Sequence, residues 1–141
     1  MSDFTHQINT AAKFNQLVKN EDDKDINKVL LFTKKDKVTP VFKALSAEFR
    51  DRIRFYVIPI VDKKTPQDLL DIFNSYNAKD LPAIITEQSF NIQDNEVLDE
   101  VINVDYGKVS SDLPQLMKFM RTIARKIPKE ELKESQQAKE D

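Results

Sequence analysis

Two kinds of hydrophobic pattern alternate along this chain. Residues Val29 to Phe32 and Phe55 to Val61 form unbroken apolar runs, which are typical of strands buried on both faces. Around these runs, apolar residues recur three and four positions apart, and this spacing predicts helices. The helices are expected at about residues 10–20 and 40–51, from Thr65-Pro66 through Tyr76, and from residue 111 or 112 to a point before Pro128.

Three further strands are expected from shorter patterns. One lies near residues 7–9, one over residues 83–86 and one over residues 101–106. The intervening residues 87–100 are polar and acidic, and they are expected to form an exposed excursion. Because strands alternate with helices, the order favours a layered α/β domain, in which a central mixed β-sheet carries helices on both faces. The last two strands are expected to pair antiparallel.

Length and composition fit one compact domain over residues 1–127. The chain has 141 residues, of which 40% are hydrophobic. Residues 128–141 are charged and rich in Gln, so a disordered tail or linker is expected there. The longest apolar run, Phe55 to Val61, is far shorter than the roughly 18 residues that a membrane helix needs. No membrane contact is therefore expected.

The composition also removes several classes of function. The chain has no Cys, which excludes disulfides, thiolate metal sites and thiol nucleophiles. One His, His6, cannot build a His-rich zinc site, and one Gly, Gly107, cannot supply a glycine-rich phosphate cradle. With 22 basic and 24 acidic residues, the chain lacks the positive charge that nucleic acid attracts. We expect no catalytic residue, no metal and no cofactor.

Four segments together resemble the thioredoxin fold over about residues 5–126. They are the central strand Val29-Leu30-Leu31-Phe32, the helix from Pro40 to Phe49, the pair Leu81-Pro82, and Tyr106-Gly107-Lys108 before the last helix. The resemblance implies that Leu81-Pro82 is the cis-proline loop of the fold. More narrowly, residues 28–47 are similar to the Cys-free modules of protein disulfide isomerase relatives and of DnaJ–thioredoxin fusion proteins of the endoplasmic reticulum.

The departures from this family bear directly on function. Catalytic members carry Trp-Cys-x-x-Cys before the helix, where this chain has only the thiol-free segment from Thr33 to Thr39. The buried acid that moves protons in those members corresponds to Leu31 here. Because exchange requires an attacking thiolate, the resemblance implies a module without this chemistry.

The resemblance places a candidate peptide-binding site at Leu81, Pro82 and Ala83. In such folds the backbone before the cis-proline can pair with an extended peptide as an added strand. An apolar surface near Val38 and Phe42 would lie beside it. The alternative is that Leu81-Pro82 only makes the turn into the next strand.

A second candidate is an anion site formed by Lys34, Lys35 and Lys37. These three ammonium groups precede the expected start of a helix, where backbone N–H groups also favour anions. The alternative is that the lysines only keep the loop solvated.

The leading hypothesis is a non-catalytic module within a larger protein-folding protein of the disulfide isomerase or DnaJ type. Its partners would be unfolded polypeptide or neighbouring domains, and the isolated domain would be a monomer. The endoplasmic reticulum lumen is the expected location, with the cytoplasm as the alternative. The alternative functions are a glutathione-binding, transferase-like enzyme and a purely structural spacer.

Overall fold

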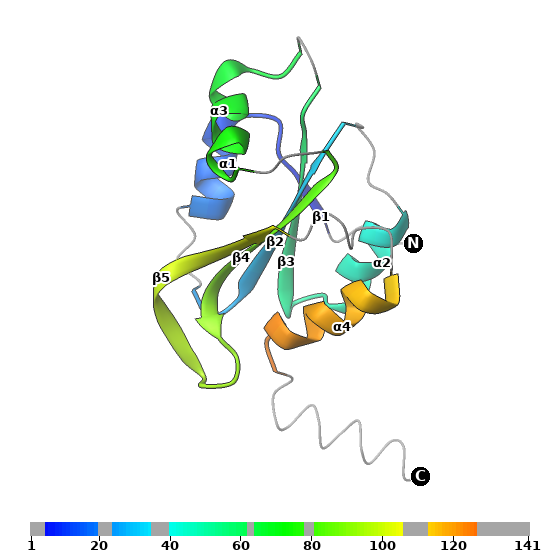
Figure 1. Cartoon of the computed structure of the whole chain (residues 1–141), viewed down its shortest axis with the longest axis vertical. Coiled ribbons are helices and arrows are strands. Elements are labelled where there is room, and N and C mark those ends of the chain that lie inside the picture. Colours follow the sequence, from blue (N-terminus) through cyan, green and yellow to red (C-terminus); the bar gives the residue numbers. More distant parts are fainter. Residues whose placement is uncertain are drawn as a thin grey trace.

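Five strands form one mixed sheet in the computed structural model (Figure 1). The structure describes residues 5–19, 24–34, 40–61, 64–77, 81–105 and 113–126. The strands are β1 (Thr5–Gln7), β2 (Asn27–Thr33), β3 (Ile53–Pro59), β4 (Ala83–Asn91) and β5 (Glu96–Asp105). Their order across the sheet is β1-β3-β2-β4-β5. The central strand β2 runs parallel to β3 and antiparallel to β4.

Helices cover both faces of this sheet. Helix α1 (Ala11–Phe14) continues into the π-helical segment η1 (Asn15–Lys19), and together with α3 (Gln67–Ser75) it covers one face. Helices α2 (Pro40–Glu48) and α4 (Leu113–Ile123) cover the other face. Figure 1 shows the two pairs on opposite sides of the strands. The expected α/β architecture, a mixed sheet between two helical layers, is confirmed.

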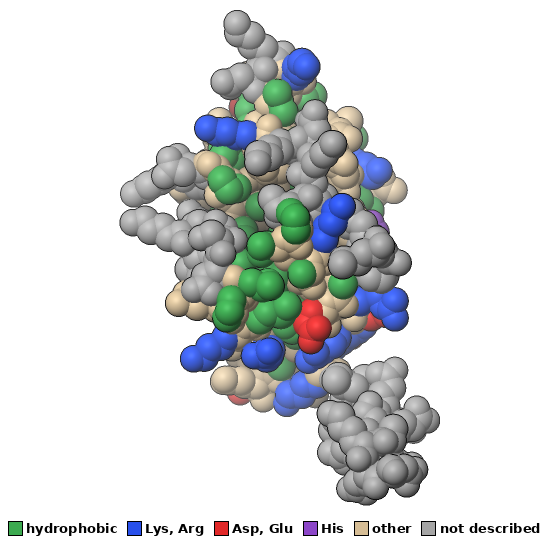
Figure 2. All heavy atoms as spheres, turned by 90° about the vertical axis from the view of Figure 1, so that its right-hand side faces the viewer, with side chains coloured by type: hydrophobic (Ala, Val, Ile, Leu, Met, Phe, Trp, Pro, Cys, Tyr) green, Lys and Arg blue, Asp and Glu red, His purple; other side chains and the backbone are tan. Residues whose placement is uncertain are grey.

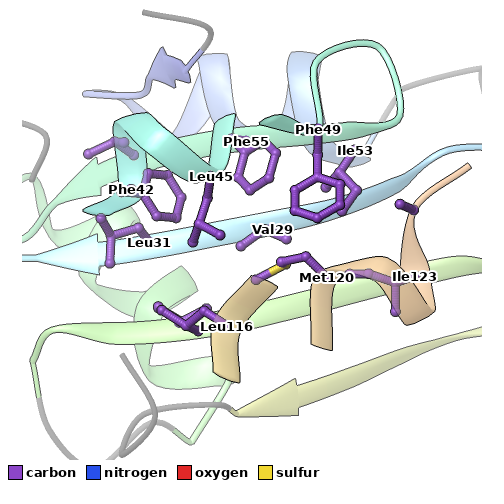
Figure 3. Packing of buried hydrophobic residues seen from close by; sticks show 13 residues of the cluster. Val29, Leu31, Phe42, Leu45, Phe49, Ile53, Phe55, Leu116, Met120 and Ile123 are labelled. Carbon is purple, nitrogen blue, oxygen red and sulfur yellow. The ribbon is translucent and has the colours of Figure 1, made fainter. Parts of the chain in front are cut away.

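The core between α2, α4 and the sheet is apolar throughout its centre (Figure 3). Phe42 of α2 is 2% exposed and meets Phe55 of β3 edge to face, with 5.5 Å between ring centroids. Leu31 is also buried in this cluster. The side chain that the resemblance matches to a proton-carrying acid therefore lies among other hydrocarbon side chains.

The core on the opposite face is built around Phe32 of β2. Its ring lies 5.0 Å from that of Phe73 and 5.7 Å from that of Tyr76, measured between centroids. Ile8, Phe14 and Leu69 complete the packing. Because successive residues of β2 point to opposite faces, its unbroken apolar run fills both cores.

The side-chain hydrogen bonds at the starts of α1 and α3 differ. Thr10 caps α1, because its side chain accepts a hydrogen bond from the Lys13 N–H at 3.1 Å. At α3, Thr65 does not cap the helix. Its hydroxyl turns back to Val61, accepting from the N–H at 2.6 Å and donating to the C=O at 2.9 Å. Helix α2 ends at Glu48, three residues before the expected end.

The prediction of an exposed excursion over residues 87–100 was wrong. These residues extend β4 to Asn91 and start β5 at Glu96, so the two strands form one long antiparallel hairpin. Polar residues are tolerated here because they find partners: the buried Ser89 hydroxyl donates to the Lys24 C=O at 2.9 Å. Asn95, with φ 57°, lies in the turn. The tail predicted over residues 128–141 lies outside the described residues.

A buried amide at the start of β2 holds the hairpin that β4 and β5 form. The Asn27 side chain is fully buried, and its Oδ1 accepts from the N–H groups of Ser89 at 2.9 Å and Phe90 at 3.0 Å. Its Nδ2 donates to the C=O groups of Phe90 at 3.1 Å and Ile123 at 2.9 Å. One side chain therefore joins β2, β4 and the end of α4.

Candidate functional site

One end of the sheet brings the candidate residues together. Strand β2 ends at Thr33, and the chain re-enters the sheet as β4 at Ala83, which pairs with Phe32. Residues Leu81 and Pro82 therefore lie next to the end of β2, as Figure 1 shows for the two strands. Helix α2 starts at this end too, because it follows β2 in the chain.

The Leu81-Pro82 peptide bond is cis, as the resemblance implied. Pro82 is exposed, whereas the Leu81 side chain is half-buried against the core that contains Phe32. No hydrogen bond joins the Leu81 backbone to any other residue that the structure describes. The described pairing of β4 with β2 therefore begins at Ala83, after Leu81 and Pro82.

The other predicted peptide-binding residues occupy different environments. Ala83 is 1% exposed and belongs to the sheet, so it can contribute its backbone only. Phe42 does not form an apolar surface: it is 2% exposed, because its ring fills the core against Phe55. The expectation for Phe42 is corrected accordingly. Val38 lies outside the described residues.

Val41, the residue before Phe42, is a partly buried apolar side chain on the face that α2 and α4 cover. It is half-buried at the start of α2 and packs over the core together with Leu113 and Met117 of α4. Figure 2 shows hydrophobic side chains gathered over the face that α2 and α4 form. The signal was available in the sequence, since Phe42, Leu45 and Phe49 already mark the inward stripe and leave Val41 at its margin.

The predicted anion site can be described only at its first residue. Lys34 is exposed at the end of β2, where an ammonium group can meet an acidic partner. Lys35 and Lys37 lie outside the described residues.

A pocket of about 130 Å³ lies at the carboxyl end of β3, lined in part by Pro59, Val61 and Thr65. It is too small for a ligand of drug size, which needs about 300 Å³ or more.

A partly buried polar cluster lies farther along β4, where Glu87 pairs with Lys28. The Tyr76 hydroxyl donates to the Glu87 carboxylate at 3.0 Å, and Lys19 Nζ lies 3.5 Å from the same carboxylate. Burial, with the negative charge of Glu87 beside it, raises the pKa of Tyr76 well above its usual value. The phenol therefore stays protonated and acts as a fixed donor behind Phe32.

Chemically, the described part of the site offers a free backbone edge, a small apolar surface and one ammonium group. No group of three or more His, Cys, Asp or Glu side chains that could hold a metal ion occurs among the described residues. In the same part of the chain, every helix is too short or too polar to cross a membrane.

Comparison with known proteins places the fold. No protein-family model matches the sequence, and no curated protein matches it either. Thioredoxin NaTrxh from Nicotiana alata superposes with a TM-score of 0.60 at 12% identity, over 89% of this chain and 96% of that one. Thioredoxin O2 from Arabidopsis thaliana gives a TM-score of 0.60 at 18% identity, over 89% and 98%.

A third similar structure is a part of ERdj5, with a TM-score of 0.56 at 14% identity. The match covers 86% of this chain and 15% of ERdj5, so the chain spans a small fraction of that protein. At these identities the comparisons establish the fold alone. The chain therefore has a thioredoxin-like fold, built without a cysteine.

Proposed function

We propose that this chain is a non-catalytic thioredoxin-like module that captures extended polypeptide at the Leu81-Pro82 edge. The observation that carries the proposal is the half-buried Leu81, whose backbone has no hydrogen bond to another described residue, beside the exposed Pro82. In the same proposal the module works inside a longer folding-assistance protein of the endoplasmic reticulum lumen.

Capture would proceed by strand addition. An extended client pairs its backbone with the N–H and C=O groups of Leu81, and its side chains contact Val41 on one side. Lys34 favours an acidic residue in the client, because its ammonium group is exposed at the same end of the sheet. No covalent bond forms or breaks, so binding is reversible and recognises backbone more than sequence.

The proposal is of a module without thiol chemistry, and its support is the amino-acid sequence. Thiol exchange needs a thiolate, and the chain has no Cys. Leu31 fills the place of the acid that would carry protons, and it is buried among hydrocarbon side chains. A module of this kind can bind a client without reacting with it.

A binding assay with a permanently unfolded, fluorescently labelled polypeptide tests the proposal. The chain is expected to raise the fluorescence anisotropy, and V41S is expected to weaken binding about tenfold because the apolar contact is lost. P82A is expected to weaken binding as well, because it alters the backbone beside Leu81. P66A is the matched control, since Pro66 is also exposed but lies at the start of α3.

Three results would contradict the proposal. Equal binding by all variants would place the client elsewhere on the molecule. No binding at any concentration would leave a structural spacer, and a thermal shift with glutathione alone would favour the transferase-like alternative. Reduction of insulin disulfides by the purified chain would refute the non-catalytic reading.

A further inference from the structure

Strand β5 forms an open edge of the sheet. It stands last in the strand order and pairs with β4 on one side only, and no described strand lies on its other side. Figure 1 shows it at the outer margin of the sheet. At ten residues it is the longest strand of the described sheet, so it presents a long row of backbone donors and acceptors.

The exposed apolar side chains of the molecule gather on this strand. Val97 is 51% exposed, and Val101 and Ile102 are each 50% exposed. No other large hydrophobic side chain in the described part of the chain is exposed to this extent. Since apolar residues on an open strand favour contact with a further strand, this edge is a candidate interaction surface.

The charges on the strand are all of one sign. Its sequence, EVLDEVINVD, holds four acidic residues and no Lys or Arg. Glu96, Asp99 and Glu100 are exposed, and no ion pair joins them to another described residue. The edge therefore combines exposed hydrocarbon with uncompensated negative charge.

A bulge places two of these acids near the middle of the strand. Gln88 pairs with Ile102, whereas Phe90 pairs with Val97, so residues 98–101 lie opposite Ser89 alone. The backbone of β4 is fixed at this point, because the N–H groups of Ser89 and Phe90 donate to Asn27. Asp99 and Glu100 thus project from a segment with a rigid support behind it.

We propose that β5 binds an extended segment of another protein in which Lys or Arg residues alternate with apolar ones. Such a segment can add a strand beside β5, cover the exposed valines and isoleucine, and neutralise the acidic side chains. A second copy of this chain is a poor partner, because pairing two β5 strands would place acid against acid with no base between them. The surface is separate from the Leu81-Pro82 edge and does not depend on it.

A labelled decapeptide that alternates Lys with Val serves as the probe. The chain is expected to bind it, and the variant D99K with E100K is expected to bind at least about tenfold more weakly. The control variant E48K with D71K changes the net charge by the same amount on two exposed helical positions. It is expected to bind within about twofold of the parent chain.

Two altered peptides separate strand addition from simple attraction of charge. A peptide with Glu in place of Lys should not bind the parent chain and should bind the D99K/E100K variant. A Lys-Val peptide methylated on every backbone nitrogen keeps its charge but cannot donate a backbone hydrogen bond from either edge, so it should bind about tenfold more weakly.

The outcomes are distinct. Undiminished binding of the methylated peptide, or equal weakening in the E48K/D71K control, would overturn the proposal. So would concentration-dependent dimerisation of the parent chain that D99K/E100K abolishes or strengthens, because β5 would then be occupied by a second copy. Binding of the Lys-Val peptide should survive P82A, which separates this surface from the proposed client site.

Discussion

Replacing Asn27 with alanine should be among the most damaging single changes in this protein. The side chain is fully buried and makes four hydrogen bonds, which tie β2 to β4 and to the end of α4. N27A removes all four at once and leaves two backbone N–H groups and two C=O groups without that partner. The backbone pairing of β2 with β4 and the bond from the Arg125 N–H to the Arg52 C=O would remain, but the direct link between β2, the hairpin and α4 would be lost.

The expected loss can be worked out from the burial of each bond. The bonds to the Ser89 N–H and the Ile123 C=O are buried, and leaving such groups unpaired costs about 1–3 kcal/mol each. The two bonds to Phe90 are partly buried, so water can replace them at a cost of about 0.5 kcal/mol each. The sum is about 3–7 kcal/mol, a large share of the roughly 5–15 kcal/mol that stabilises a typical domain.

Urea-induced unfolding followed by circular dichroism measures this loss, since the chain has no Trp for fluorescence. N74A is the matched control, because Asn74 is exposed on α3, and it should change the free energy of unfolding by less than about 0.5 kcal/mol. N27D supplies a further check. Its carboxylate would face the C=O groups of Phe90 and Ile123, so its pKa should be raised and stability should recover as the pH falls.

A loss below about 1 kcal/mol for N27A would refute this reasoning. It would mean that water replaces the amide at little cost, or that the hairpin is held chiefly by other contacts. The bulge in β5 would then lack the rigid support on which the edge-strand proposal draws.

Three further changes test other parts of the account. Because the pKa of Tyr76 is raised in the folded chain, its contribution to stability is complete below about pH 10 and is lost as the pH rises further. Above about pH 10, the free energy of unfolding measured in urea should therefore decrease less steeply with pH for Y76F than for the parent chain. T86V should raise the free energy of unfolding by about 1 kcal/mol, because the buried Thr86 hydroxyl has no hydrogen-bond partner among the described residues, and a lower stability in urea would contradict this. F42A should lower the free energy of unfolding by about 3–5 kcal/mol in the same assay, because the Phe42 side chain is buried. A loss below about 1 kcal/mol would indicate that the side chain is not part of the core.

The sequence was sufficient to predict the layers of the fold. The unbroken apolar run Val29–Phe32 and the part of the second run from Phe55 to Pro59 became strands with both faces buried, because each residue in turn faces one of the two cores. Ile60 and Val61 lie beyond the end of β3. The helical spacing of Leu69, Ile72 and Phe73 became α3 for the same reason. These signals are strong because burial on a definite face leaves few alternatives for the chain.

The hairpin was missed because polar residues carry no strong periodic signal. Glu87 can lie in β4 because its carboxylate accepts a hydrogen bond from Tyr76 and pairs with Lys19. Ser89 can lie there because its hydroxyl donates to the Lys24 C=O. These partners belong to other segments of the chain. Asn27 was missed for the same reason, since its four bonds form only once β4 and α4 are in place. At the candidate site, Leu81-Pro82 could be chosen from a resemblance. The position of Val41 beside the inward stripe could be read from the sequence, but its half-burial was established only by the structure.

The central claim is that the Leu81-Pro82 edge receives an extended chain, and amide chemical shifts recorded during titration with an unfolded polypeptide test it most directly. The account predicts that the shifts of Lys34, Val41, Leu81 and Ala83 move together and saturate, with V41S weakening the response. Absence of any shift, or shifts confined to β5, would contradict the claim.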